Sequence, residues 1–281
     1  MSGSALKSDG HLGVLLTELR LPTMKRLAAD LCEQSDREGW PARRLLEQLL
    51  QFEVAEREVR RFDRHRAESG LDLDKRLSTF DFNAVATISK AQVIALVESQ
   101  QWLDRGANIL AFGAPGAGKS HLLSGIGHAL VDAGKRVLFT RCSDIVQRLQ
   151  AARRDLRLPQ ELQKLDRFDL LILDDISYVR RDQAETSVLF ELIAERYERK
   201  SIAITANTPF SQWSEVFVDA AMTHAAIDRL VHHATILEMN VESYRRRAAE
   251  ANAASQRVAR KTPPPATKHQ ALAKPARSRP A

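Results

Sequence analysis

A glycine-rich stretch at residues 113–120, Gly-Ala-Pro-Gly-Ala-Gly-Lys-Ser, has the clearest chemical meaning in the chain. It matches the pattern G-x-x-x-x-G-K-[ST] in full, between a short apolar run and a helix-forming segment. Gly116 and Gly118 let successive backbone N–H groups face an anion, and a following helix N-terminus adds favourable partial charge. The stretch predicts a phosphate-binding loop in which Lys119 reaches the β- and γ-phosphates and Ser120 ligates Mg²⁺. The alternative, a chance glycine loop, does not explain this context.

A pair of carboxylates follows the apolar run at 170–173. A buried strand that ends in a carboxylate places it where the shell of a Mg²⁺ ion needs it. We assign Asp174 to the metal, directly or through water, and Asp175 to polarising the attacking water. Many related sites use the longer Glu at the second position, so hydrolysis could be slow. The alternative is an acidic strand end without a role, and Asp169 at the other end of the run is interpreted as structural.

Two later residues could complete such a site. Asn207 ends another apolar run, where its amide could lie between the γ-phosphate and the attacking water; it could equally be a turn residue before Pro209. Arg229 lies beyond the nucleotide-binding strands and could stabilise phosphoryl-transfer charge in a neighbouring subunit. Its alternative is a surface pair with Asp228.

Two further groups invite a functional interpretation. His232 and His233 are adjacent, but on a helix they would point in different directions, and no Cys or carboxylate joins them at ligand spacing, so a metal site is not predicted. The arginines at 148, 153, 154 and 157 fit a solvated helix face, unless they line a nucleic-acid channel.

The segments around these residues alternate between strand-like and helix-like patterns. Apolar runs at 109–112, 137–140, 170–173, 202–206 and 234–239 are separated by helical periodicity. Apolar runs without strict alternation indicate a parallel sheet covered on both faces. The fold class is therefore α/β, a P-loop NTPase sheet flanked by helices. Before it, the helical spacing of Met24, Leu27 and Leu31 and of Leu45, Leu49 and Phe52 predicts a small all-helical domain.

Composition and charge along the chain suggest where its domains begin and end. We expect a helical interaction domain at 1–70, a linker and lead-in helix at 71–105, the ATPase domain at 106–248 and a disordered basic tail at 249–281. The net charge of +6 is concentrated at the end, where Glu250 is the only acid after residue 244. Such a tail suggests a polyanion partner, although a tail that only aids solubility is equally compatible. No membrane span or secretory signal is expected, and two distant cysteines fit a cytoplasmic protein.

Taken together, these segments resemble the AAA+ ATPases, and more specifically the IstB-like transposition helper proteins of bacterial insertion sequences. The resemblance covers roughly residues 11–250. It is carried by Leu-Thr-Glu-Leu-Arg-Leu-Pro-Thr-Met-Lys at 16–25, Gly-Ala-Pro-Gly-Ala-Gly-Lys-Ser-His-Leu at 113–122, Leu-Asp-Asp at 173–175, Ala-Asn-Thr-Pro-Phe-Ser-Gln-Trp at 206–213 and Ala-Ile-Asp-Arg-Leu-Val-His-His-Ala at 226–234. The phosphate loop is generic, and the first and the last two segments are more specific.

The resemblance implies an ATP-dependent, double-stranded DNA-binding protein that oligomerises on DNA and helps a transposase to choose its target. Asp174 and Asp175 fall in the Walker B motif, Asn207 at sensor 1 and Arg229 at the arginine finger of the neighbouring subunit. Arg245, Arg246 and Arg247 are candidates for sensor 2. The nucleotide contacts would come from Gly113, Ala114, Pro115, Gly116, Ala117, Gly118, Lys119, Ser120 and His121.

Two alternatives stay open at this stage. A helicase loader shares this ATPase core and would act on a replicative helicase. A small-molecule P-loop kinase would need an acceptor pocket and no Arg229, but it explains neither the helical N-terminus nor the basic tail. Subunit number, DNA sequence preference and hydrolysis rate do not follow from the sequence.

Overall fold

The computed structural model describes residues 5–176, 182–209, 212–213 and 219–239. Five strands form a sheet in the order β2-β3-β4-β1-β5, and every neighbouring pair is parallel. The strands are β1 (Asn108–Gly113), β2 (Val137–Arg141), β3 (Leu170–Asp174), β4 (Ser201–Ala206) and β5 (Ala234–Met239). The predicted parallel α/β sheet with flanking helices is confirmed, with strand bounds within one or two residues of the apolar runs.

Helices precede the sheet and connect its strands. They are α1 (Ala5–Glu18), α2 (Pro22–Glu38), α3 (Ala42–Glu68), the 3₁₀ turns η1 (Leu77–Thr79) and η2 (Phe82–Ala84), α4 (Lys90–Ser99), α5 (Gln101–Asp104), α6 (Lys119–Asp132), α7 (Cys142–Arg154), α8 (Leu158–Leu165), α9 (Gln183–Arg196) and α10 (Ala220–Val231). None of the helices in the described ranges is long and apolar enough to cross a bilayer.

The sheet is buried on both faces, which explains its continuous apolar strands. Leu110 and Phe112 of β1 face a core built with α7, α8, α9 and α10. Ile109 and Ala111, which alternate with them, face a second core with α6 and the segment that follows α3. Because successive side chains of a strand point to opposite faces, a strand covered on both sides must be apolar at every position.

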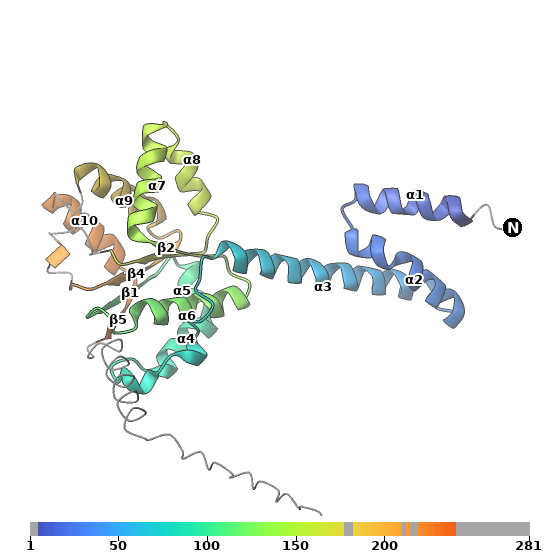
Figure 1. The fold of residues 1–281 in the computed structure, drawn as a ribbon, viewed down its shortest axis with the longest axis horizontal. Coiled ribbons are helices and arrows are strands. Elements are labelled where there is room, and N and C mark those ends of the chain that lie inside the picture. The colour runs from blue at the N-terminus through green and yellow to red at the C-terminus, as the bar shows by residue number, and fades with distance from the viewer. Residues whose placement is uncertain (1–4, 177–181, 210–211, 214–218, 240–281) are drawn as a thin grey trace, which may run out of the picture.

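The predicted helical N-terminal region is confirmed as three helices. Figure 1 shows α3 extending away from the sheet, with α1 and α2 beside its far part. A small separate cluster of Leu16, Met24, Ala28 and Leu49 holds these helices together. Phe52, which the same helical spacing placed with Leu49, is 45% exposed instead.

The end of α3 contacts the sheet directly. The Phe139 N–H of β2 donates to Ser69 O at 2.7 Å. Gly70 follows in the left-handed region (φ 64°), and a Cβ there would lie 2.8 Å from Phe139 O. Only glycine fits both demands. The next segment, which we expected to be a linker, buries Leu71 and Phe80 in the core against α6.

The N-terminus of α2 is capped by a residue from another helix. Leu21 offers no capping side chain there. Instead the buried Glu53 carboxylate of α3 accepts hydrogen bonds from the N–H groups of Thr23 (2.8 Å) and Met24 (3.0 Å), and from Arg57. Burial raises the pKa of the Glu53 carboxyl, but these hydrogen bonds outweigh it, and the pKa lies below its ordinary value. The carboxylate therefore fastens α2 to α3.

Replacing Glu53 by Gln should loosen α2 specifically. Two N–H groups at a helix end lose a charged acceptor, a loss of about 1–3 kcal/mol. The measurement is hydrogen exchange of the α2 amides, with Glu47→Gln as control, because its exposed pair with Arg43 contributes at most about 0.5 kcal/mol. The pKa of the Glu53 carboxyl is lower in the folded chain than in the unfolded chain. The stabilisation of the fold by the ionised carboxylate is therefore complete above the unfolded pKa of about 4.3 and is lost as the pH falls through the folded pKa. Equal α2 protection in both variants would contradict the capping role.

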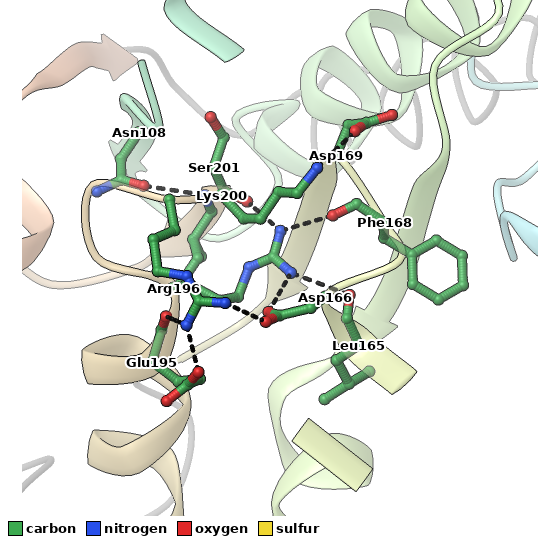
Figure 2. A network of polar contacts seen from close by, with 11 residues as sticks. Asn108, Leu165, Asp166, Phe168, Asp169, Glu195, Arg196, Lys200 and Ser201 are labelled. Atoms are coloured by element: carbon green, nitrogen blue, oxygen red, sulfur yellow. Dashed lines mark hydrogen bonds and ion pairs between the residues drawn. The ribbon is translucent and has the colours of Figure 1, made fainter. Parts of the chain in front are cut away.

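The buried Arg196 at the end of α9 stabilises the edge of the sheet at which the strands begin. Its guanidinium donates to Leu165 O (3.0 Å), Phe168 O (3.0 Å) and Ser201 O (2.9 Å), as Figure 2 shows. Burial lowers the pKa of Arg196 to about 10, with Asp166 and Asp169 opposing the shift. Asp169, interpreted as structural, accepts from Lys200 and from the Arg136 N–H.

Candidate nucleotide-binding site

The glycine-rich loop connects β1 to α6, as the sequence predicted. Gly113 ends β1 and Gly118 precedes α6, and both have positive φ (152° and 97°), as has Gly116 (83°). A Cβ on Gly113 would come within 2.5 Å of Met239 O on β5, so the neighbouring strand leaves no space for a side chain. The loop therefore takes a backbone path open only to glycine and ends at a helix N-terminus, which favours anions.

Lys119 is the first residue of α6, and its side chain is turned back onto the loop. Its ammonium donates to Gly113 O (2.7 Å), Ala114 O (2.9 Å) and Asn207 Oδ1 (2.8 Å). The residue is buried, with 6% exposed. A buried ammonium must be satisfied by acceptors, and these contacts fix its charge at the mouth of the loop.

Ser120 and Asp174 meet although they lie in different elements. The Ser120 hydroxyl donates to Asp174 Oδ1 at 2.6 Å. Thr205 of β4 also donates to Asp174 Oδ1, at 2.7 Å. A serine hydroxyl and a carboxylate in contact at a loop that fits phosphates are the oxygen ligands that Mg²⁺ takes in nucleotide sites. These donors fit the ion that the sequence predicted.

Asp175 has an unusual backbone for a non-glycine residue, with φ 61°. The Asp175 N–H donates to Thr205 Oγ1 at 2.7 Å, and Asn207 Nδ2 donates to Asp175 Oδ1 at 2.9 Å. Residues in the left-handed region cost of order 1 kcal/mol or more and cluster at functional sites. Asn207 thus bridges Lys119 and Asp175, so three predicted site residues form one hydrogen-bonded chain.

These groups line a cavity of about 520 Å³. The carboxyl ends of β1, β3 and β4 supply the loop, the two aspartates and Asn207, as expected where parallel strands end at one edge. A second wall comes from the segment after α3 and includes Phe80, Ala84 and Val85. An apolar wall beside an anion-binding loop suits a nucleotide, whose base and phosphates need these two environments.

His121 lies where the two walls meet. Its Nε2 is 3.1 Å from Thr79 Oγ1 and 3.1 Å from Arg76 O, and its ring packs edge-on against Phe80 with centroids 5.4 Å apart. His121 lines the cavity, as predicted, and also joins α6 to the segment after α3.

The sequence analysis did not predict eight of the residues that line the cavity: Lys75, Thr79, Phe80, Asp81, Ala84, Val85, Arg141 and Thr205. Arg141 ends β2 and is paired in register with Asp174, so its position at a strand end was the available signal. Thr205 lies two residues before Asn207 on the same strand. Phe80 and Val85 carried no signal, because nothing in the sequence relates the segment after α3 to the loop.

Arg229 lies outside this cavity. The Asn108 amide at the start of β1 donates to the backbone oxygen of Leu230 at 3.0 Å. Because β1 spans six residues that rise about 3.3 Å each, roughly 17 Å separates that edge of the sheet from the loop. The Arg229 guanidinium instead lies over the rings of Phe190 (5.2 Å) and Tyr197 (6.0 Å). The structure therefore does not join Arg229 to the site of its own chain.

Three of the arginines after β2 (Arg148, Arg153 and Arg154) lie on α7, and Arg157 lies directly before α8. Arg148 pairs with Glu161, Arg153 with Glu191 and Arg157 with Asp155. Pairs of this partly exposed kind contribute little to stability and can be exchanged for other anions. Arg154 is the last residue of α7.

Some predictions fall outside the described residues. They are the sensor 2 candidates at 245–247 and the basic tail at 249–281.

Comparison with known proteins also indicates a nucleotide-binding protein. A family model described as "IstB-like ATP binding protein" matches residues 14–252. An insertion sequence ATP-binding protein of Sinorhizobium fredii is 61% identical over 241 residues, which cover 86% of this chain and 81% of that protein. The ATP-binding protein of insertion sequence IS21 from Pseudomonas aeruginosa is 35% identical over 235 residues, covering 84% and 88%.

Solved structures show a similar fold. AMPPCP-bound DnaA from Aquifex aeolicus superposes with a TM-score of 0.53 at 17% identity, covering 66% of this chain and 57% of that one. At this identity the similarity concerns the fold alone.

Proposed function

Since this chain belongs to the IstB-like ATP-binding proteins of insertion sequences, we propose that it is a Mg²⁺-dependent ATPase that oligomerises on double-stranded DNA and assists a transposase in selecting its target. The observation that carries the catalytic part is the convergence of Lys119, Ser120, Asp174, Asp175 and Asn207 on one cavity. The family match favours this function over a helicase loader or a small-molecule kinase.

The loop and Lys119 perform the binding. The loop, apart from Pro115 and Ala117, offers backbone N–H groups to the phosphates, and the helix N-terminus at Lys119 adds partial positive charge. The Lys119 ammonium, which donates to Gly113 O and Ala114 O at the loop mouth, adds a full positive charge when it turns toward a phosphate. Ser120 and Asp174 would hold the Mg²⁺ ion, which would neutralise negative charge on the phosphates.

Asp175 and Asn207 are proposed to handle the attacking water. The Asp175 carboxylate would accept a hydrogen bond from the water and orient it, as carboxylates at this place in NTPases do. The Asn207 side-chain nitrogen donates to Asp175 Oδ1 and so fixes that carboxylate. The Asn207 side-chain oxygen accepts a hydrogen bond from the Lys119 ammonium. Movement of the Lys119 ammonium toward a phosphate would therefore be transmitted to the residue that holds the water-orienting carboxylate.

Thr205 is proposed to position both acids, so Thr205→Val should slow hydrolysis more than ATP binding. The valine keeps the shape but removes one of the two donors to Asp174 Oδ1, since Ser120 remains, and it leaves the Asp175 N–H without the Thr205 acceptor. Losing such hydrogen bonds costs about 1–3 kcal/mol, which corresponds to roughly 5–150-fold in kcat. The measurement is steady-state ATPase kinetics together with a nucleotide-binding titration.

Thr205→Ser is the matched control, because it keeps the hydroxyl and removes only a methyl group. It should retain most of the turnover. Equal losses of turnover in the two variants would mean that packing, and not the hydroxyl, explains the effect.

Arg229 is proposed to act on the site of a neighbouring subunit. Its place near the start of β1 supports this, because the length of the strand separates it from the loop of its own chain. The aromatic rings of Phe190 and Tyr197 hold the guanidinium without neutralising it, so it can meet developing negative charge. Arginines supplied in trans accelerate phosphoryl transfer by about 10³–10⁵-fold.

Mixing two inactive variants should restore activity if Arg229 acts in trans. Arg229→Ala keeps its own loop and acids, and Asp175→Asn keeps its arginine. In a randomly mixed oligomer about a quarter of the sites would combine an intact acid with a neighbour's arginine, giving up to about a quarter of the wild-type rate. The measurement is ATPase rate across mixing ratios, with each variant alone as control. Additive rates would contradict a trans role.

The remaining contacts are proposed from position and charge. The helical region at 1–70 would be an interaction domain, residues 71–105 its connection and 106–248 the ATPase domain. Arg148, Arg153 and Arg157 would contact DNA phosphates, because their carboxylate partners are exchangeable. The basic tail would do the same through its positive charge. Such binding should weaken steeply with salt.

The whole proposal is tested by measuring ATP hydrolysis by the protein alone, with duplex DNA, and with duplex DNA plus an insertion-sequence transposase. We expect DNA to stimulate hydrolysis and the transposase to bind the ATP-loaded, DNA-bound oligomer. Binding to a replicative helicase in place of the transposase would support the helicase-loader alternative. A monomer that phosphorylates a small molecule would overturn the proposal.

A further inference from the structure

Three side chains that can bind metals lie together at the sheet edge opposite the nucleotide cavity. Glu198 Oε1 is 3.5 Å from His232 Nδ1 and 3.7 Å from His233 Nε2. One ligand atom from each residue lies within 4.8 Å of the others. The sequence expectation that no carboxylate joins the two histidines is therefore wrong. Glu198 comes from a different turn, which only the fold brings next to them.

The backbone positions each of these side chains. Glu198 lies in the turn between α9 and β4 and has φ 56°, a conformation that non-glycine residues adopt at a cost. His232 and His233 form the turn between α10 and β5, with ring centroids 4.0 Å apart. Adjacent histidines in a turn can face one point, unlike adjacent histidines within a helix. The two turns therefore present two imidazoles and a carboxylate to the same volume.

The geometry points to a Zn²⁺ site formed by Glu198, His232 and His233. In a tetrahedral site with ligands about 2.1 Å from the ion, neighbouring ligand atoms are roughly 3.4 Å apart, close to the two separations from Glu198. Two histidines and a glutamate are a ligand set that zinc uses with an open fourth position. Mg²⁺ is disfavoured, because it prefers oxygen ligands. The site is thus separate in chemistry from the proposed Mg²⁺ position at Ser120 and Asp174.

The surroundings allow an ion to enter and remain. The three side chains are about half exposed. Glu198 and His233 border a second cavity of about 580 Å³, which also has Trp102 and Arg105 in its wall. That cavity leaves space for water or an added ligand at the fourth position.

Tyr197 gives the cluster an outer partner. Its hydroxyl is 2.8 Å from His232 Nδ1 and also interacts with Glu198. On metal binding at Nδ1 the hydroxyl would keep Glu198 as its acceptor, an arrangement typical of the residues that orient metal ligands. Tyr197 also contacts the Arg229 guanidinium. An ion here would therefore tie the turn after α9 to the end of α10 that carries Arg229.

The test is Zn²⁺ titration of the full chain without Mg²⁺ or nucleotide, by competition with a chromophoric chelator. Co²⁺ binding, followed by visible absorption, reports the coordination geometry. The variants are Glu198→Gln and the double variant His232→Asn/His233→Asn. His224→Asn is the matched control, because His224 is an exposed histidine on α10 that lies outside the cluster.

We expect the wild type and His224→Asn to bind one Zn²⁺ per chain with equal affinity, and Zn²⁺ to raise their melting temperature. Glu198→Gln should bind at least about tenfold more weakly, since loss of even an outer-shell partner costs about 10–100-fold. The double variant should lose both the binding and the thermal shift. Its melting temperature without metal and its ATP binding show whether it folds, and Glu198→Gln serves alone if it does not.

Two results would overturn the site. One is wild-type protein that binds no stoichiometric Zn²⁺, which would leave the cluster as hydrogen bonds and ion pairs only. The other is a folded double variant, or a Glu198→Gln chain, that binds Zn²⁺ as the wild type does, which would place the ion elsewhere. Neither result depends on ATPase activity, so failure of this site leaves the proposed function intact.

Discussion

The Lys119→Ala chain should bind ATP at least about 30-fold more weakly than the wild type and should fail to assemble on DNA. The variant removes the ammonium that sits at the loop mouth on Gly113 O, Ala114 O and Asn207 Oδ1. Removing one partner of a buried, charge-assisted contact costs about 2–5 kcal/mol. The Asn207 amide also loses a partner, so turnover of any residual bound ATP should fall as well.

A fluorescent ATP analogue measures the binding, and sedimentation with duplex DNA measures the assembly. Lys135→Ala is the control, because Lys135 follows the same helix but lies outside the cavity, near Asp104. DNA-bound oligomers of unchanged size in the Lys119→Ala chain would show that ATP does not control assembly. Loss of assembly in both variants would indicate a general defect.

The Asp175→Asn chain should bind ATP and assemble on DNA normally while losing turnover by about 10²–10⁴-fold. Asparagine has nearly the same shape, and its side-chain oxygen can still accept the Asn207 Nδ2 hydrogen bond that the aspartate accepts at 2.9 Å. Only the negative charge that would polarise the water is removed. Single-turnover ATP hydrolysis separates this loss from any change in binding.

Asp175→Glu is the charge-preserving comparison for Asp175→Asn. It keeps the charge and extends the side chain, so substantial turnover is expected. The left-handed backbone at φ 61° suits Asp and Asn better than Glu, so ATP binding by Asp175→Glu is measured as well, to separate backbone strain from the loss of turnover. Wild-type turnover in the Asp175→Asn chain would remove Asp175 from the mechanism and turn attention to Asn207 as the residue that orients the water.

Much of the fold followed from local patterns. The apolar runs predicted all five strands, because a strand buried on both faces needs apolar side chains at each position. The phosphate loop was equally visible, since its glycines are required by backbone conformations that other residues avoid, as at Gly113 and Gly118. The family resemblance on the quoted segments agrees with the family model match.

Other features had no local signal. Thr205 contacts Asp174 and the Asp175 N–H only because β3 and β4 are neighbours in the sheet. Phe80 forms a wall of the cavity because the segment after α3 folds onto α6. The carboxylate of Glu198 meets His232 across two turns at one sheet edge.

The sequence by itself determined the chemistry of the loop and the type of each element, because both depend on residue identity and on spacing along the chain. The tertiary structure decided which strand ends share an edge, and therefore that Asp174, Asp175 and Asn207 meet Lys119 and Ser120. It also decided that Arg229 stands at the opposite edge. The physical reason is that strand order and packing arise from burying the two faces of the sheet at once, and this depends on contacts between residues far apart in sequence.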